Sequence, residues 1–298
     1  MEILKSLEGV DLVAVCDPVN DIRKQRQEEY KVEKGYAEVS AMLANENLDA
    51  IVAAPPPHLN AKVAMECLDA GVDTLLEKPP GFTIDEAIAL RDTSVRTGAK
   101  AMVGWNRRFH PMLLQAQAMV LKRGPIIQLV AEFHKSAKEI ESKNRYDAFV
   151  MDRLLLESPI HAIDTICALA NSKVVEVQGL VRRATTSYRD VHAGVILFES
   201  GCVASIIANY TAGVRLERYE IHGDEISCYL EGIRTGVAYI KGEKVELEGI
   251  QDTSAVDQDR YFIDCVRSGC SIERPGANLD TAVETMELAH DILENIRN

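Results

Sequence analysis

Short, continuously apolar runs alternate with longer amphipathic segments through the first third of the chain. The runs are typical of strands buried on both faces of a parallel sheet, and the segments between them have helical periodicity. This alternation predicts a doubly wound, Rossmann-like α/β sheet. The strands are expected at residues 10–16, 49–54, 72–77 and 100–105. The helices are expected at residues 1–8, 19–33, 38–44, 59–70 and 83–97, and Thr83 and Glu86 can form a capping box at the start of the last one.

The pattern changes after residue 106. A polar stretch at 135–151 is expected to be a loop over a site, and a helix that ends at Ala170 follows it. Beyond Asn171, apolar and polar residues alternate with period two and short turns, which predicts an antiparallel sheet. We predict two domains, residues 1–106 with the parallel sheet and residues 107–298 as an α+β domain with a large, mostly antiparallel sheet. The elements expected in the second domain are helices at 112–123, 256–268 and 279–296, the last capped by Asn278, and strands at 126–134, 174–183, 191–199, 202–210, 216–222, 225–231 and 238–245.

Composition narrows the class of protein. The chain has 298 residues, 47% of them hydrophobic, which is enough for two ordinary globular cores. A formal net charge of −13 argues against nucleic acid or an anionic membrane as the main partner. No apolar run is long enough to span a bilayer, and no signal peptide is recognisable. The seven cysteines form no C-x-x-C motif, so we expect reduced thiols, a cytoplasmic location and no metal site.

One predicted strand ends in a charged pair, Glu77 and Lys78, before two prolines and a glycine. In open α/β sheets this carboxyl edge is where ligands bind. A lysine there can hold a substrate oxygen, and the neighbouring carboxylate can orient its ammonium group. The alternative is a solvated charge pair at a strand end, and these residues alone do not decide between the two.

Asp17 ends the strand at residues 10–16. A carboxylate at the end of the second strand of a dinucleotide-binding sheet accepts hydrogen bonds from the two adenosine ribose hydroxyls, and it repels the extra phosphate of NADP. Asp17 in that role favours NAD over NADP. Taken alone, however, the Asp-Pro pair is better explained as a turn.

The glycine-rich loop of such a sheet would lie about 20 residues before Asp17, which is upstream of Met1, and no G-x-G-x-x-G occurs in the chain. We therefore expect a parallel sheet that lacks its first strand, with the strands at 10–16 and 49–54 on either side of the gap. Those strands could pair directly, or another segment could fill the gap. The interpretation we favour is that the natural protein begins further upstream.

A second group of polar residues lies in the segment that leads into the helix ending at Ala170. Glu157, His161 and Asp164 are spaced i, i+4 and i+7, so we expect them to share one helix face. A histidine between two carboxylates is suited to proton transfer because its pKa lies near neutrality. The alternative is a polar, solvated helix face.

Several motifs, taken in order, resemble the Gfo/Idh/MocA oxidoreductases, the glucose–fructose oxidoreductase and inositol dehydrogenase relatives. These motifs are Val13 to Pro18, Ala54 to His58, Glu77-Lys78-Pro79 and Gly104 to Phe109. The segment from Glu157 to Asp164 is similar to the D-x-G-x-H-x-I-D stretch of that family, with glutamate in place of the first aspartate.

The resemblance implies an NAD(P)-dependent dehydrogenase that moves a hydride between nicotinamide and a sugar, cyclitol or related polyol. It makes Lys78, His161 and Glu157 the catalytic residues: Lys78 would polarise the substrate oxygen, and His161 would take the hydroxyl proton. Lys78, Glu157, His161 and Asp164 would bind the substrate. The residues implied in cofactor binding are Asp17, Pro55, His58, Glu77, Lys78, Asn106 and Arg107, although His58 could instead cap the helix that follows it.

The resemblance also implies a homodimer or homotetramer that assembles through the sheet of the C-terminal domain. The alternative function is that of a non-catalytic relative that senses a ligand or regulates a partner after losing dinucleotide binding. A lysine, a histidine and a carboxylate kept together argue against that alternative, because a sensor has less need of a proton relay.

Overall fold

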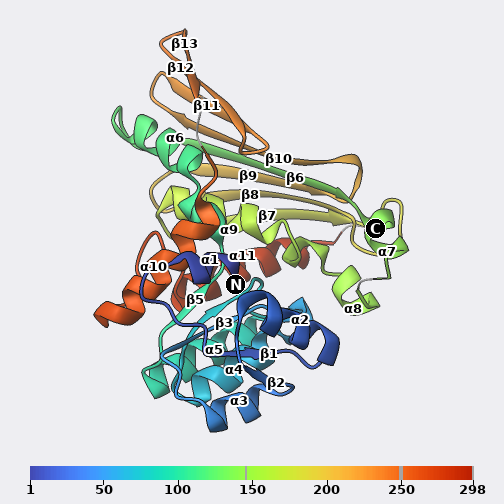
Figure 1. Cartoon of the computed structure of the whole chain (residues 1–298). Helices are drawn as coiled ribbons and strands as arrows, with labels where there is room; N and C mark the ends of the chain where they lie inside the picture. The colour runs from blue at the N-terminus through green and yellow to red at the C-terminus, as the bar shows by residue number, and fades with distance from the viewer. Residues whose placement is uncertain (145, 248–250, 297–298) are drawn as a thin grey trace. The chain divides into compact units, whose positions relative to one another are not determined.

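A computed structural model describes residues 1–144, 146–247 and 251–296. The chain folds into two units, each described separately below (Figure 1). Unit 1 comprises residues 1–104 and 255–282, and unit 2 comprises residues 105–254 and 283–298. Across the described residues, no helix is both long enough and apolar enough to cross a membrane.

Unit 1 contains two parallel sheets. Strand β1 (Ala14–Cys16) pairs with β2 (Lys34–Tyr36), and β3 (Ala50–Ala53), β4 (Asp73–Leu76) and β5 (Ala101–Val103) form a second sheet in that order. The predicted class of fold is confirmed. Strand β2 was not predicted, because it is short and largely exposed and so has no apolar run that would mark it. Helix α1 (Glu2–Ser6) precedes β1, and the helices between the strands are α2 (Asn20–Tyr30), α3 (Val39–Asn45), α4 (Asn60–Asp69) and α5 (Ile84–Thr97).

The two strands expected on either side of the gap belong to separate sheets among the described residues. Strand β1 is not hydrogen-bonded to β3, so direct pairing of these two strands, one of the three arrangements considered, is wrong. Residues 10–13 were expected to belong to β1 and lie outside it. Val13, which directly precedes β1, and Val52, which lies in β3, are both more than a third exposed.

Unit 1 also includes a segment that the sequence analysis assigned to the second domain. Helix α10 (Ser254–Ser268) packs onto the parallel sheet, where Phe262 and Cys265 contact Leu75 of β4 and Met102 of β5. The boundary after residue 104 lies close to the predicted one, but the return of residues 255–282 was not predicted. An amphipathic helix shows that one face is buried, and it does not show against which sheet.

The strands described in unit 2 form an eight-stranded sheet in the order β13-β12-β11-β10-β6-β9-β8-β7 (Figure 1). Strands β6 and β9 are parallel, and all other neighbours are antiparallel, which confirms the predicted, mostly antiparallel sheet. The bounds are β6 (Gln128–Ser136), β7 (Val174–Arg182), β8 (Val191–Phe198), β9 (Val203–Asn209), β10 (Thr211–Gly223), β11 (Ile226–Glu231), β12 (Thr235–Ile240) and β13 (Glu243–Leu247).

Helices of unit 2 pack on one face of this sheet. Helix α9 (Ile160–Ala170) lies on β6 and β9, and α6 (Pro111–Leu121) lies on β10 and β11. Helix α11 (Leu279–Leu293), capped by Asn278 as predicted, approaches β7 and β8 closely. Added β-carbons at Gly179 and Gly194 would lie 3.0 Å and 2.9 Å from Ile292, so these strand glycines allow the close contact.

In unit 2, one predicted strand is divided in the structure and one predicted loop contains helices. The strand expected at 238–245 is two strands, β12 and β13, joined at Lys241 and Gly242, which both have positive φ and so suit a tight hairpin turn. The loop expected at 135–151 contains the short helices α7 (Ala137–Ser142) and α8 (Ala148–Met151), which are too short to show periodicity.

Candidate functional site

Glu77 and Lys78 lie directly after β4, at the carboxyl edge of the parallel sheet in unit 1. The Glu77 amide donates to the Ala53 carbonyl across the end of β3 at 2.9 Å. The Lys78 amide donates to the side chain of Glu77 at 3.3 Å, and the Lys78–Pro79 peptide is cis. The structure therefore puts this pair where the strand ends, as the sequence predicts.

The segment after Lys78 is held by the start of the next helix. Thr83 caps α5 and forms the predicted capping box with Glu86. The Glu86 carboxylate also accepts hydrogen bonds from the backbone amides of Phe82, at 2.7 Å, and of Thr83, at 3.0 Å. The chain between Lys78 and α5 thus has a defined path.

Asn60 holds the same segment from another helix, and sequence reasoning missed it. Asn60 is the first residue of α4 and is buried. Its Nδ2 donates to the carbonyl of Glu77 at 3.1 Å and to the carbonyl of Pro79 at 3.0 Å. These two carbonyls lie on either side of Lys78.

Asp17 follows β1 and is half-buried. Its Oδ1 accepts a hydrogen bond from the Val19 amide at 2.7 Å, and its backbone carbonyl accepts one from Arg23 at 2.5 Å. Within the described residues Oδ2 accepts no hydrogen bond. Asp17 therefore makes the turn considered in the sequence analysis and still has one carboxylate oxygen open to a ribose hydroxyl.

Pro55 and His58 lie in the connection that follows β3. His58 belongs to the 3-10 turn η1 (Pro57–Leu59) and is exposed. Among the described residues, no side chain caps the start of α4, so the prediction that His58 caps this helix is wrong. His58 lies within η1, which directly precedes α4, and its imidazole does not accept a hydrogen bond from the first amides of α4.

Glu157 of unit 2 lies in a buried polar cluster. Its Oε2 accepts hydrogen bonds from Lys135 at 2.9 Å and from the phenol of Tyr210 at 3.2 Å, and its Oε1 accepts one from Tyr146 at 3.3 Å. Lys135 also donates to Ser158 Oγ at 3.0 Å. Burial and the Glu157 charge raise the pKa of Tyr210 well above its ordinary value, so this phenol remains a donor.

The predicted helix face of Glu157, His161 and Asp164 is wrong in one respect. Helix α9 begins at Ile160 after Pro159, so His161 and Asp164 lie on it, whereas Glu157 lies between the 3-10 turn η3 (Leu154–Leu156) and α9. Proline at the N-cap position is compatible with a helix start and not with a continuous helix through residue 159. Glu157 is oriented by Lys135 and Tyr210 from the sheet.

Asp164 has an environment different from the one expected for a substrate ligand. It is fully buried, and Arg108 donates to both of its oxygens at distances of 2.6 to 3.1 Å. Thr285 of α11 lies 3.5 Å from the same carboxylate. These contacts favour a structural role, in which the pair joins the turn η2 (Asn106–Phe109) to α9 and α11.

Asn106 and Arg107 begin η2 and interact with each other. Arg107 donates to Asn106 Oδ1 at 2.9 Å and forms a bidentate ion pair with Glu217 of β10, with both distances 2.8 Å. Glu217 also accepts a hydrogen bond from Tyr219 at 3.1 Å. Arg107 is therefore fixed by the sheet of unit 2.

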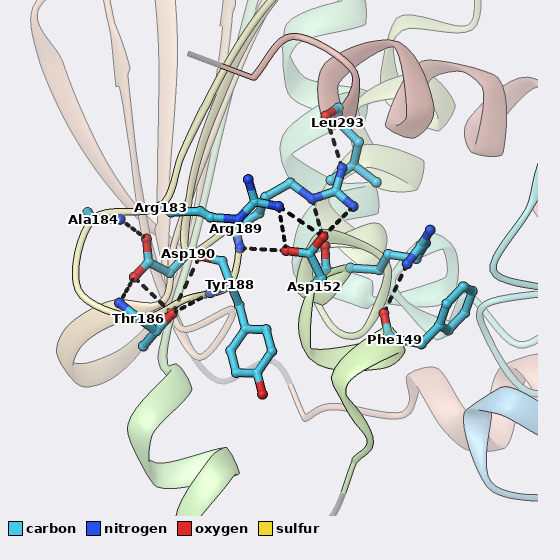
Figure 2. Close-up of polar contacts among 10 residues, drawn as sticks. Phe149, Asp152, Arg183, Ala184, Thr186, Tyr188, Arg189, Asp190 and Leu293 are labelled. Atoms are coloured by element: carbon cyan, nitrogen blue, oxygen red, sulfur yellow. Dashed lines mark hydrogen bonds and ion pairs between the residues drawn. The ribbon is translucent and has the colours of Figure 1, made fainter. Parts of the chain in front are cut away.

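A further polar network anchors the segment before Glu157 (Figure 2). Arg189, in the loop between β7 and β8, donates through its Nε to the Asp152 carbonyl at 2.8 Å and forms an ion pair with the Asp152 carboxylate at 3.0 Å. It also donates to the Leu293 carbonyl of α11 at 3.2 Å. Asp152 directly follows α8, so Arg189 ties this segment to the sheet and to a helix.

Comparisons with known proteins follow the same division of the chain. Residues 2–105 match the family model described as an oxidoreductase family with an NAD-binding Rossmann fold, and residues 116–228 match the GFO/IDH/MocA C-terminal domain.

The chain belongs to the Gfo/Idh/MocA oxidoreductase family.

Relatives in this family include scyllo-inositol 2-dehydrogenase (NAD(+)) of Bacillus subtilis, 22% identical over 90% of this chain and 82% of that protein. Another is D-apiose dehydrogenase of Paraburkholderia graminis, 25% identical over 93% and 80% of the two chains. An oxidoreductase from Agrobacterium radiobacter, solved with NAD+, L-tartaric acid and magnesium, has the same fold with a TM-score of 0.83 and 16% identity, over 99% of this chain and 91% of that one.

Membership of the Gfo/Idh/MocA family confirms the resemblance stated from the motifs, the oxidoreductase class and NAD as the cofactor. Unit 1 fits part of this cofactor, since Asp17 has an open carboxylate oxygen at the end of a parallel strand, where an adenosine ribose binds in such sheets. The residues that sequence reasoning missed, Asn60, Arg108, Lys135 and Tyr210, act through tertiary contacts that no motif marks.

Proposed function

We propose that this protein is a dehydrogenase that transfers a hydride between NAD and a hydroxyl-bearing carbon of a sugar, cyclitol or related polyol. The observation that carries the proposal is the position of Lys78 directly after β4, in a segment that Asn60 and Glu86 hold on both sides. The names of the relatives, which include inositol and apiose dehydrogenases, support the class of substrate.

The proposed roles follow from the chemistry of the side chains. The Lys78 ammonium binds the substrate oxygen that changes oxidation state, and His161, in the first turn of α9, accepts the hydroxyl proton during oxidation. NAD, when bound, supplies the hydride acceptor. Glu157, held by Lys135 and Tyr210, accepts a hydrogen bond from a neighbouring hydroxyl of the substrate. Asp164 acts indirectly, by fixing α9 through Arg108.

For the cofactor, we propose that Asp17 binds the adenosine ribose and that Pro55, His58, Glu77, Lys78, Asn106 and Arg107 contribute to the remaining contacts. Because the open Asp17 oxygen suits a ribose diol and repels a phosphate, NADH is expected to bind more tightly than NADPH. Asp17→Ser should narrow that difference, measured by the change in cofactor fluorescence on titration. Tighter binding of NADPH by the unmodified chain would contradict this assignment.

Turnover tests the catalytic roles. The chain is assayed for NADH formation with a panel of inositols, aldoses and sugar acids, and then Lys78→Ala and His161→Ala are compared with it. Each variant is expected to lose about a hundredfold or more in kcat while keeping its melting temperature.

Lys100→Ala and His222→Ala are matched controls. Lys100 lies just before β5 and pairs with Asp73. His222 is the penultimate residue of β10 and contacts Ser227 and Glu220. Both are expected to keep the wild-type kcat. Wild-type turnover by Lys78→Ala and His161→Ala would refute the assignment, and the absence of both NADH binding and turnover on any polyol would favour the sensor function.

We also propose that the protein forms a homodimer or homotetramer through the face of the unit 2 sheet that points away from Leu129, Ala131 and Phe133. The strand register brings an apolar patch together on this face, and charged residues of β6 and β10 flank it. The patch consists of Leu180, Ala193, Val195, Leu197, Val203 and Ile207, and the flanking residues are Glu132, Arg218 and Glu220. Alternating charges beside an apolar centre are self-complementary, which suits a second copy of the chain.

We also propose a cytoplasmic location, which is inferred from the cysteines.

A further inference from the structure

We propose that Asn60 is a positioning residue for Lys78, which fixes the backbone on both sides of the lysine so that its ammonium group meets the substrate oxygen in one orientation. This inference rests on the proposed role of Lys78.

The geometry of the Asn60 amide is the first support. The side chain is only 1% exposed, and its Nδ2 makes the two hydrogen bonds to the carbonyls of Glu77 and Pro79. Both neighbours are carbonyl oxygens, which can only accept, so the amide nitrogen must face them. One side chain therefore uses both of its N–H groups to bridge the residue before Lys78 and the residue after it.

The backbone of this segment has little other support from the sheet. Strand β4 ends at Leu76, and the Glu77 amide continues the ladder beyond it, to the Ala53 carbonyl. Asn60 supplies the missing partners from helix α4, whose Ala64, Cys67 and Leu68 are completely buried. A rigid helix thus replaces the neighbouring strand as the support for Glu77 to Pro79.

The side-chain oxygen of Asn60 indicates that a contribution to stability does not by itself explain why an asparagine is present here. Its Oδ1 is buried and has no hydrogen-bond partner within the described residues. An unsatisfied buried acceptor costs about 1 to 3 kcal/mol, which offsets much of what the two donated bonds contribute. Asn60 therefore adds little net stability, and its place at the strand end beside Lys78 is better explained by a role in positioning that lysine.

The test compares Asn60→Ala and Asn60→Ser with the unmodified chain. Asn60→Ala removes both N–H donors. Asn60→Ser keeps a single O–H donor on a shorter side chain, and this variant is used if Asn60→Ala does not fold. We expect kcat to fall by about tenfold to a hundredfold, with a much smaller change in KM, because a displaced catalytic group costs turnover more than binding.

Thr74→Val is the matched control. Thr74 is also fully buried and lies in β4, and its hydroxyl donates to the Val72 carbonyl at 2.9 Å, at the opposite end of the strand from Lys78. The variant loses a buried hydrogen bond and some thermal stability, yet it is expected to keep the wild-type kcat. A loss of kcat in Thr74→Val equal to that in Asn60→Ala would show that Asn60 acts only through stability.

A second measurement does not depend on turnover. Trace acetylation followed by mass spectrometry gives the reactivity of individual lysines, with Lys100 as the internal reference. Release of the segment in Asn60→Ala is expected to raise the labelling of Lys78 relative to Lys100, and Thr74→Val is expected to leave that ratio unchanged.

The two measurements separate the failures. Full turnover by Lys78→Ala would refute the proposed role of Lys78 whatever Asn60 does. Loss of turnover in Lys78→Ala, together with wild-type kcat and wild-type labelling of Lys78 in Asn60→Ala, would refute the positioning role of Asn60.

Discussion

At the scale of single residues, Asp190 shows how one buried carboxylate organises a loop. It is fully buried and accepts hydrogen bonds from the backbone amides of Ala184, Thr185 and Thr186 at 2.6, 2.8 and 2.9 Å (Figure 2 includes the first and third of these residues). Burial alone would raise the pKa of Asp190, but the hydrogen bonds together outweigh it, so the pKa lies below its ordinary value. The connection from β7 to β8 closes around this side chain.

We predict that Asp190→Asn lowers the free energy of unfolding by about 3 kcal/mol, because an amide cannot accept from every donor that faces the carboxylate. The stabilisation from Asp190 should be complete above the unfolded pKa of about 3.9 and should be lost as the pH falls through the lower pKa of the folded state. Urea unfolding at neutral pH and at acidic pH measures both effects. Asp224→Asn, in an exposed turn, is the control, and equal loss in the two variants would contradict the prediction.

At the scale of elements, the buried pair of Arg108 and Asp164 joins η2, α9 and α11. The pair is inaccessible to solvent, with side-chain exposures of 3% and 0%. Burial by itself would lower the pKa of Arg108, and the Asp164 charge more than compensates, so the pKa of Arg108 is raised. The orientation of α9, and hence of His161, depends on this contact.

We predict that Asp164→Ala and Arg108→Ala each lower the free energy of unfolding by about 3 to 5 kcal/mol, because each leaves a buried charge without its partner. The double variant should lose clearly less than the sum of the two. Chemical denaturation of all four proteins measures this coupling.

The same cycle distinguishes the two roles considered for Asp164. A structural role predicts that Arg108→Ala and Asp164→Ala, which break the same contact, change the KM for a polyol substrate to a similar extent. A large rise in KM that is specific to the variants lacking Asp164 would support the hypothesis, made from the sequence, that Asp164 contacts the substrate directly.

At the scale of the whole molecule, the proposed oligomer assembles through the open face of the unit 2 sheet. Val195 is 52% exposed and Ile207 is 41% exposed, and both lie within the apolar patch. We predict that Val195→Lys combined with Ile207→Lys converts the oligomer to a folded monomer, because a lysine there would be buried without a partner in the interface. Sedimentation velocity measures the mass.

Val95→Lys is the control for this prediction. Val95 lies in α5 of unit 1, is 78% exposed and is outside the patch. The variant should sediment like the unmodified chain. An unchanged oligomer in the double variant would place the interface elsewhere.

Much of the fold could be predicted from local patterns. Strands β1, β3, β4 and β5 of unit 1 follow from apolar runs along the chain, as most strands of unit 2 follow from period-two alternation. The capping box of Thr83 and Glu86 and the Asn278 cap follow from residues that are close in sequence. The motifs around Asp17, Lys78 and His161 were also sufficient to recognise the family, because such motifs are read along the chain.

The tertiary structure decided what depends on distant contacts. Helix α9 starts at Ile160, so Glu157 is oriented by Lys135 of β6 and by Tyr210, which lies between β9 and β10, and not by helical spacing. Arg108 fixes Asp164 across 56 positions of sequence, and Asn60 supports Lys78 through hydrogen bonds that span 17 and 19 positions. Sequence spacing describes neighbours along one element, whereas these groups meet only because helices and strands pack, and that packing determines which carboxylates are buried and which backbone segments are held.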